Sequence, residues 1–207
     1  MFIGEEQEWA KGEENAWQRL AASVPAEVCR RTGACFDEYS GTYFLDVFNV
    51  SVAIYCGRRE IRGTGDLCNL LLSKLRHFSR LSILWYMVQA QDIPSSGSLI
   101  HPRELDGGLI FTQGSHILPL DKLALKYQED MEGFMNRGKT LGGEFRKFGD
   151  SSIMLYPFPR VPVLLVLWLK EEEYPARAQL LFDATCPHHL PTDIIWSTAM
   201  MSITVML

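Results

Sequence analysis

The stretch Val161-Pro162-Val163-Leu164-Leu165-Val166-Leu167-Trp168-Leu169 decides the fold. Its continuous apolar character is typical of a central strand that is covered on both faces. Two further apolar runs lie close by in the chain, from Ile153 to Tyr156 and from Ala178 to Phe182. Together the three runs predict the core strands of a sheet.

The N-terminal part of the chain predicts a helix followed by a hairpin. Apolar residues recur at helical spacing from Glu13 to Arg31, with a kink or restart expected at Pro25. The β-rich runs 43–48 and 50–55 follow, and the tight connection near Asn49 favours a two-stranded hairpin.

Three further helices are expected. The segment Leu67 to Gln91 predicts a buried helix that bends near Phe78-Ser79, and a second helix is expected from Pro119 to Gly138. Pro191-Thr192-Asp193 resembles a helix start, and the helix would continue through Met206.

This order of elements predicts an α+β fold rather than a regular βαβ alternation. We expect a central, mostly antiparallel sheet of about five or six strands, flanked by helices. The 207 residues and the 47% hydrophobic content predict a single domain, 1–207. In this domain, a helical segment at 1–40 would pack on a core at 41–207.

The composition disfavours several classes of partner. A net charge of −5 argues against a generic nucleic-acid or anionic-membrane surface. Five scattered cysteines fit reduced thiols in a cytoplasmic protein better than a disulfide framework. The N-terminus lacks the pattern of a secretory signal, and the longest apolar runs are too short to cross a bilayer. We therefore expect a cytoplasmic protein without nucleic-acid or membrane partners.

No strong catalytic signature is present, so candidate sites come from local chemistry. Arg160 lies in Tyr156-Pro157-Phe158-Pro159-Arg160-Val161-Pro162, where prolines hold the backbone extended and fix the direction of the guanidinium. Such an arginine suits a carboxylate or phosphate ligand, or an internal ion pair with Asp183.

Two further segments carry polar candidates. Trp168 is followed by the acidic run 171–173, in which Glu172 and its neighbours could act as acid and base, hold a hard cation, or form a solubilising turn. Arg103 precedes Gly107 and Gly108 in a segment that is either a short helix with a glycine stop or a loop that faces a ligand.

The segment Cys186-Pro187-His188-His189 places three potential metal ligands, Cys186, His188 and His189, within four residues. A complete site would need further ligands, such as His116, His101 or Asp183, from elsewhere in the fold. The alternative is that the adjacent histidines are exposed or cap the following helix.

The order of several short motifs resembles a prokaryotic family catalogued as domain of unknown function 3786, from about Gly41 to the C-terminus. These motifs are Arg103-Glu104-Leu105-Asp106-Gly107-Gly108, Leu141-Gly142-Gly143, Pro157-Phe158-Pro159-Arg160-Val161-Pro162, Leu167-Trp168, Glu172-Glu173-Tyr174-Pro175-Ala176, Leu181-Phe182-Asp183 and Leu190-Pro191-Thr192-Asp193. The resemblance implies a small cytosolic protein of anaerobic bacteria and archaea, some of whose relatives carry an iron–sulfur domain. It implies a setting of redox or corrinoid-type metabolism and assigns no reaction. This chain lacks a cysteine-rich cluster motif, so we expect no iron–sulfur cluster in it.

Three functional hypotheses follow. The leading one is a non-catalytic accessory domain that binds a small molecule or cofactor beside redox enzymes, in a pocket bounded by Arg160, Trp168, Glu172 and Asp183, with Gly107-Gly108 nearby. The second is a hydrolase or transferase that uses Asp183 or Glu172 as base, Arg160 as anion stabiliser and His189 as proton carrier. The third is a metal-binding protein that uses Cys186, His188 and His189.

Overall fold

The apolar run after Arg160 forms β8 (Val161–Trp168), the central strand of the larger of two sheets in the computed structural model, which describes residues 3–112 and 116–207. Seven of the eight residues of β8 are buried, as expected for a strand that is covered on both faces. The sheet is antiparallel and has the strand order β5-β9-β8-β7-β6. The other strands are β5 (Leu99–Ile100), β6 (Glu144–Arg146), β7 (Ser151–Phe158) and β9 (Arg177–Asp183).

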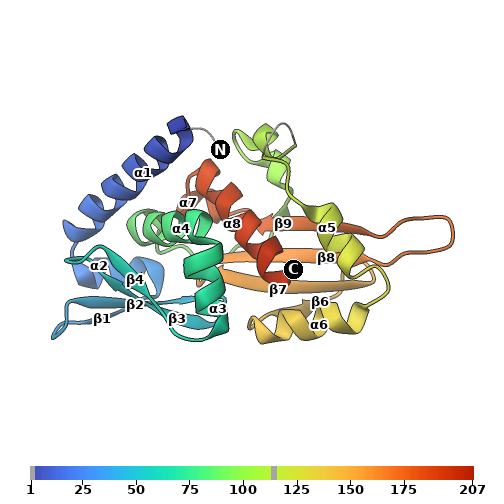
Figure 1. Cartoon of the computed structure of the whole chain (residues 1–207), viewed down its shortest axis with the longest axis horizontal. Coiled ribbons are helices and arrows are strands. Elements are labelled where there is room, and N and C mark those ends of the chain that lie inside the picture. The colour runs from blue at the N-terminus through green and yellow to red at the C-terminus, as the bar shows by residue number, and fades with distance from the viewer. Residues whose placement is uncertain (1–2, 113–115) are drawn as a thin grey trace.

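A second antiparallel sheet has the order β1-β2-β3-β4 and lies beside the larger sheet, at the lower left of Figure 1. Its strands are β1 (Cys35–Asp37), β2 (Thr42–Val47), β3 (Val50–Tyr55) and β4 (Glu60–Arg62). The predicted hairpin is confirmed. Phe48 and Asn49 form its two-residue turn with φ angles of 48° and 65°, the left-handed geometry that suits the twist of antiparallel strands.

The α+β class is confirmed, and the larger sheet has five strands, within the predicted range. The hairpin belongs to the separate smaller sheet, which the local sequence patterns do not predict. The two sheets meet where β2 contacts β7, and the Phe48 N–H donates to the Tyr156 carbonyl over 3.1 Å.

The helices largely follow the predicted positions. They are α1 (Ile3–Ala21), α2 (Pro25–Thr32), α3 (Asp66–Asn69), α4 (Arg76–Gln89), α5 (Leu120–Lys126), α6 (Met131–Thr140), α7 (Cys186–His189) and α8 (Thr192–Met206). A π-helical turn (Leu70–Lys74) joins α3 to α4, and short 3-10 helices occupy Pro102–Glu104 and Gly108–Thr112. The expected restart at Pro25 and the C-terminal helix are confirmed.

Two helix predictions were wrong in detail. The bend expected at Phe78-Ser79 occurs instead at Leu75, after the π-helical turn. The helix expected from Pro119 to Gly138 is divided into α5 and α6, because Asp130 caps α6 by accepting the Gly133 N–H over 2.8 Å.

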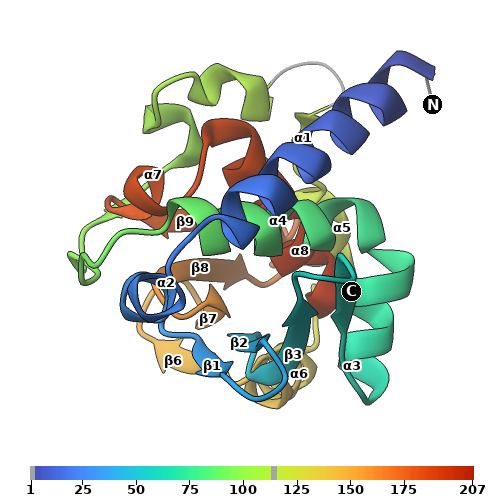
Figure 2. The ribbon, with the colours of Figure 1, turned by 90° about the vertical axis from the view of Figure 1, so that its left-hand side faces the viewer.

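The helices form layers over the sheets. Helix α4 packs on α8, and α8 contacts β7. Helix α5 contacts β9, and helix α6 contacts β7. Helix α1 packs on the outer side of α4, away from the sheets (Figures 1 and 2). Among the described residues, no helix is both long and apolar enough to span a membrane.

The Leu141-Gly142-Gly143 motif forms the turn between α6 and β6. Gly142 has a φ of 74°, and a Cβ at this position would lie 2.4 Å from the Cβ of Asn49 in the β2–β3 turn. At Gly143 a Cβ would lie 2.6 Å from Ile153 Cγ1 of β7. The two glycines therefore allow this turn to approach both sheets.

Candidate functional site

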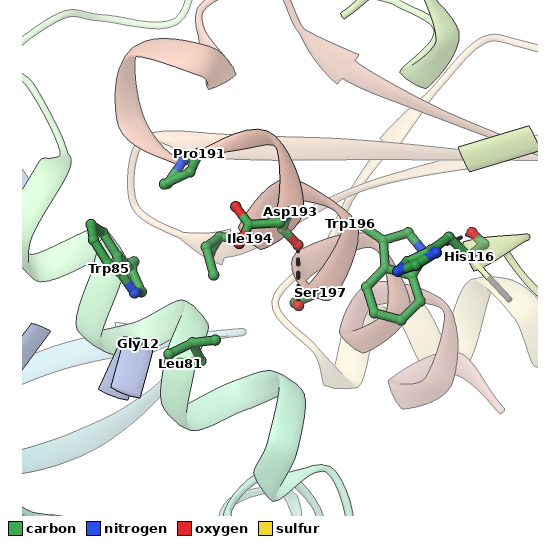
Figure 3. A pocket seen from close by; sticks show the side chains of 9 residues that line it. All are labelled: Gly12, Leu81, Trp85, His116, Pro191, Asp193, Ile194, Trp196 and Ser197. Carbon is green, nitrogen blue, oxygen red and sulfur yellow. Dashed lines mark hydrogen bonds between the residues drawn. The ribbon is translucent and has the colours of Figure 1, made fainter. Parts of the chain in front are cut away.

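A pocket of about 320 Å³ opens between α1, α4 and the first turns of α8 (Figure 3). This volume is at the lower end of the range of about 300–1,000 Å³ that is usual for small-molecule sites. The residues that line it are Gly12, Leu81, Trp85, His116, Pro191, Asp193, Ile194, Trp196 and Ser197.

Helical spacing explains how these residues come together. Leu81 and Trp85 are four residues apart and lie on one face of α4. On α8, Trp196 and Ser197 lie three and four residues after Asp193, so these three residues also share a face. Figure 3 shows Trp85 and Leu81 on one side of the opening and the α8 residues on the other. Because α4 packs on α8, the two faces form a single recess.

The two tryptophans are held by contacts with other side chains. Trp196 makes edge-to-face contacts with Phe78, at a centroid distance of 5.5 Å, and with His116, at 4.7 Å. Its Nε1–H donates to the His116 carbonyl over 2.6 Å. The guanidinium of Arg19, on α1, lies 5.3 Å from the centre of the Trp85 ring. The pocket walls are therefore largely preformed.

Two polar groups of the pocket remain available to a ligand. The Asp193 carboxylate and the Trp85 Nε1–H have no hydrogen-bond or ion-pair partner in the described part of the chain. The Ser197 hydroxyl, by contrast, donates to the Asp193 carbonyl over 3.3 Å. A ligand here would thus meet one free carboxylate and one free indole N–H, together with the His116 ring and the backbone N–H groups of the first turn of α8, which have no intrahelical partner.

Arg160 lies in the β7–β8 turn and pairs with Asp92, not with Asp183. Its Nη2 is 2.6 Å from Asp92 Oδ1 and also donates to the Arg30 carbonyl over 3.0 Å. The Arg160 backbone N–H donates to the Tyr86 hydroxyl over 3.2 Å. Since the other Asp92 oxygen is 2.6 Å from Arg30, one carboxylate neutralises two guanidinium groups.

Asp183 is the last residue of β9 and is 1% exposed. Its carboxylate accepts the backbone N–H groups of Ser96, Gly97 and Thr185 at 2.8–3.1 Å, and also the hydroxyls of Ser96 and Thr185. Burial acts to raise the pKa of Asp183, but these hydrogen bonds outweigh it and lower the pKa below its usual value. Asp183 therefore holds two loops together and has no spare capacity as a base.

The segment 186–189 forms the short helix α7, in which Cys186 and His189 are fully buried and His188 is exposed. Burial raises the pKa of the Cys186 thiol, as does the nearby Asp183 charge, so the thiol form is favoured. Within residues 3–112 and 116–207, no three His, Cys, Asp or Glu side chains are arranged to hold a metal ion. The structure thus gives the metal hypothesis no support.

His189 is a buried neutral imidazole. Burial lowers its pKa to about 4, and the Arg160 cation adds to the effect. Its Nδ1 accepts the Gln91 N–H over 3.4 Å, which places the ring proton on Nε2. Neither this Nε2 nor the Arg160 Nε has a hydrogen-bond partner among the described residues.

The remaining predicted site residues lie elsewhere. Trp168 is at the end of β8 opposite Arg160, about 25 Å away at about 3.3 Å per residue. Its ring is covered by the Arg177 guanidinium at 4.2 Å, and Glu172 is exposed in the loop that follows. The structure therefore brings Arg160, Asp183 and His189 to one end of the sheet and leaves Trp168 and Glu172 at the other.

The glycine loop lies beside the start of α8. The Thr192 hydroxyl donates to the Asp106 carbonyl over 3.0 Å, and a Cβ on Gly107 would be 3.7 Å from Thr192 Cγ2. Gly107 has a φ of 76°, and Arg103 is exposed in the preceding 3-10 helix. A short 3-10 helix is thus observed, but it ends at Glu104 with Leu105 in an extended conformation, so no glycine stops it, and Gly108 begins a second 3-10 helix. This segment is adjacent to the pocket residues Pro191 and Asp193.

Sequence reasoning missed most of the pocket. The local patterns place Asp193 in a helix start and Trp85 within a predicted buried helix, and they do not single out Trp196. The available signal was the spacing of Asp193, Trp196 and Ser197, which places two polar groups and an indole on one face of a mostly apolar helix. That spacing does not reveal which element faces them.

These features define an α+β domain with two antiparallel sheets and a small aromatic pocket between helices. The chain belongs to the family described as Domain of unknown function (DUF3786), which matches residues 24–205. The match includes α2 and all the strands, whereas α1 lies before it. No curated protein and no solved structure was found to match the chain.

Proposed function

We propose that this domain is a non-catalytic accessory domain that binds a small ligand in the pocket between α1, α4 and α8. One observation carries the proposal: the pocket combines two fixed indole rings with a carboxylate that has no partner among the described residues. Apolar walls with few oriented polar groups are typical of small-molecule sites. The proposed setting, anaerobic redox or corrinoid-type metabolism in a prokaryote with a redox enzyme as partner, comes from the family resemblance.

This proposal places the ligand at α8 rather than at Arg160 and Asp183. Both of those side chains are engaged with protein groups, Arg160 with Asp92 and Asp183 with two loops. The same contacts weigh against the hydrolase or transferase hypothesis, which uses Asp183 or Glu172 as base: Asp183 is not accessible, and Glu172 lies beyond the far end of β8 from Arg160. His189 is fully buried, which is a poor position for a proton carrier that must meet substrate.

Thermal-shift measurements test the proposal. The compounds would be benzamidine, benzamide, benzoate, phenyl phosphate and protoporphyrin, which cover cationic, neutral, carboxylated, phosphorylated and tetrapyrrole ligands. A compound at ten times its Kd should raise the Tm by about 3 °C, since it adds about 1.4 kcal/mol to the folded state.

Gly12 offers a matched pair of variants. A Cβ at Gly12 would meet only Leu81 Cδ1, at the ordinary contact distance of 3.6 Å. Gly12→Ala should therefore fold and still bind, whereas Gly12→Phe should place a ring in the pocket and abolish the shift. Equal shifts in the two variants would show that the compounds bind elsewhere, and the absence of any shift in the unmodified protein would end the proposal.

A further inference from the structure

We infer that the pocket selects a small organic cation, with an amidinium, guanidinium or ammonium group on a flat apolar body. This inference rests on the proposed function and adds the chemical class of the ligand. Among the lining side chains that the structure describes, Asp193 is the single acidic one, and none is a lysine or an arginine. A bound cation would give this carboxylate the partner that the described residues do not provide.

The polar groups of the lining also favour a donor-rich ligand. Two potential donors are already used within the protein, the Trp196 indole by the His116 carbonyl and the Ser197 hydroxyl by the Asp193 carbonyl. The charged acceptor that remains is the exposed Asp193 carboxylate, which lies beside neutral donors, the Trp85 Nε1–H and the first backbone N–H groups of α8. Hydrogen bonds in which both donor and acceptor are charged are the stronger ones, so a cationic donor gains most here.

The aromatic walls suit the same ligand. Indole rings attract cations through their electron-rich faces and stack on flat groups. The chain itself provides an example, because the Arg19 guanidinium lies 5.3 Å from the centre of the Trp85 ring. Arg80, which joins α4 to α1, is already paired with Glu13, so it does not compete for Asp193.

Three nearly isosteric probes test the inference: benzamidine, which is cationic, benzamide, which is neutral, and benzoate, which is anionic. Binding would be followed by the indole N–H resonances of Trp85 and Trp196 in ¹H–¹⁵N spectra, assigned with single Trp→Phe variants. The measurements would be made at pH 8, where a histidine side chain of ordinary pKa is neutral. Benzamidine should bind at least about tenfold more tightly than benzamide, and benzoate should bind most weakly.

Asp193→Asn provides the decisive variant, because it removes the charge and keeps the shape. It should reduce benzamidine affinity to within about threefold of benzamide affinity and change benzamide binding much less, because benzamide carries no charge. Asp121→Asn is the control, since Asp121 is an exposed residue of α5 outside the pocket. This control should keep the full preference for benzamidine.

The outcomes separate the inference from the proposed function. If benzamide and benzoate bind as tightly as benzamidine, or if Asp193→Asn keeps the preference, the cation inference is overturned while ligand binding at the pocket stands. If none of the three probes moves the Trp85 and Trp196 resonances, both fall.

Discussion

The carboxylate of Asp92 accepts a hydrogen bond from the guanidinium of Arg160 across 2.6 Å. Its second oxygen is 2.6 Å from Arg30, so Asp92 joins α2, the segment after α4 and the β7–β8 turn. Arg31 strengthens the same junction by donating to the Ala90 carbonyl over 2.6 Å, near the C-terminal end of α4.

Asp92→Asn should destabilise the protein by about 1 kcal/mol at low salt. The Asp92 side chain is 40% exposed, which limits the free energy that each ion pair contributes. The variant loses two ion pairs together, with Arg30 and with Arg160. Urea unfolding at 20 mM and 1 M NaCl would measure the effect, and the difference should shrink at high salt. Glu144→Gln, which breaks the exposed pair with Arg146, is the control and should change stability less. A larger loss at high salt would contradict the ion-pair explanation.

Asp183→Ala should destabilise the protein by at least about 3 kcal/mol. The change leaves the N–H groups of Ser96, Gly97 and Thr185 without their acceptor, and with it five partly buried hydrogen bonds to a charged group are lost. Urea unfolding followed by far-UV circular dichroism gives the free energy of unfolding. Glu38→Ala, at an exposed position, should change it by less than about 0.5 kcal/mol. An equal effect of the two variants would refute a structural role for Asp183.

His189 should make the fold sensitive to mild acid. Its pKa falls from 6.5 to about 4 on folding, so the unfolded chain binds the proton more readily. Stability is therefore unaffected by this group above about pH 6.5, and it decreases as the pH falls from there to about 4. The slope reaches at most about 1.4 kcal/mol per pH unit and the total is roughly 3 kcal/mol.

His189→Gln should flatten this acid limb in urea unfolding curves collected from pH 4 to pH 7. His188→Gln should retain it, because His188 is exposed on the same short helix. An unchanged slope in the His189 variant would mean that another group titrates.

Gly142→Ala should cost more than about 2 kcal/mol of folding free energy. The residue has a φ of 74°, and its added Cβ would lie 2.4 Å from Asn49 Cβ. Gly57→Ala is the matched control, because a Cβ there meets no atom within 4 Å and the φ is not positive. If both variants unfold at the same urea concentration, the close approach of the two turns is not a constraint.

Elements with a strong local signal could be predicted from the sequence. The continuous apolar run of β8, the restart at Pro25 and the helix after Pro191 each follow from nearby residues alone. The division of the strands into two sheets could not be predicted in this way. It depends on long-range contacts such as that between Phe48 and Tyr156, which no local pattern encodes.

The candidate site was harder to predict for the same reason. The prolines around Arg160 indicate a fixed guanidinium, but its partner Asp92 is 68 positions away. The neighbouring sequence offered Asp183 instead, which is engaged by its own loops. Likewise, the face of α8 that carries Asp193 and Trp196 was visible in the spacing, while its position opposite Trp85 depends on the packing of α4 on α8.

Helix α1 contributes Gly12 to the pocket, yet it precedes the residues 24–205 that match the family. The α4 wall that faces α8 is thus flanked at Gly12 by a segment on which the sheets of the family's fold do not depend. Substitutions in that segment would alter the width of the opening and the ligands admitted while leaving the strands untouched. Diversity of recognition could arise here without any redesign of the scaffold beneath.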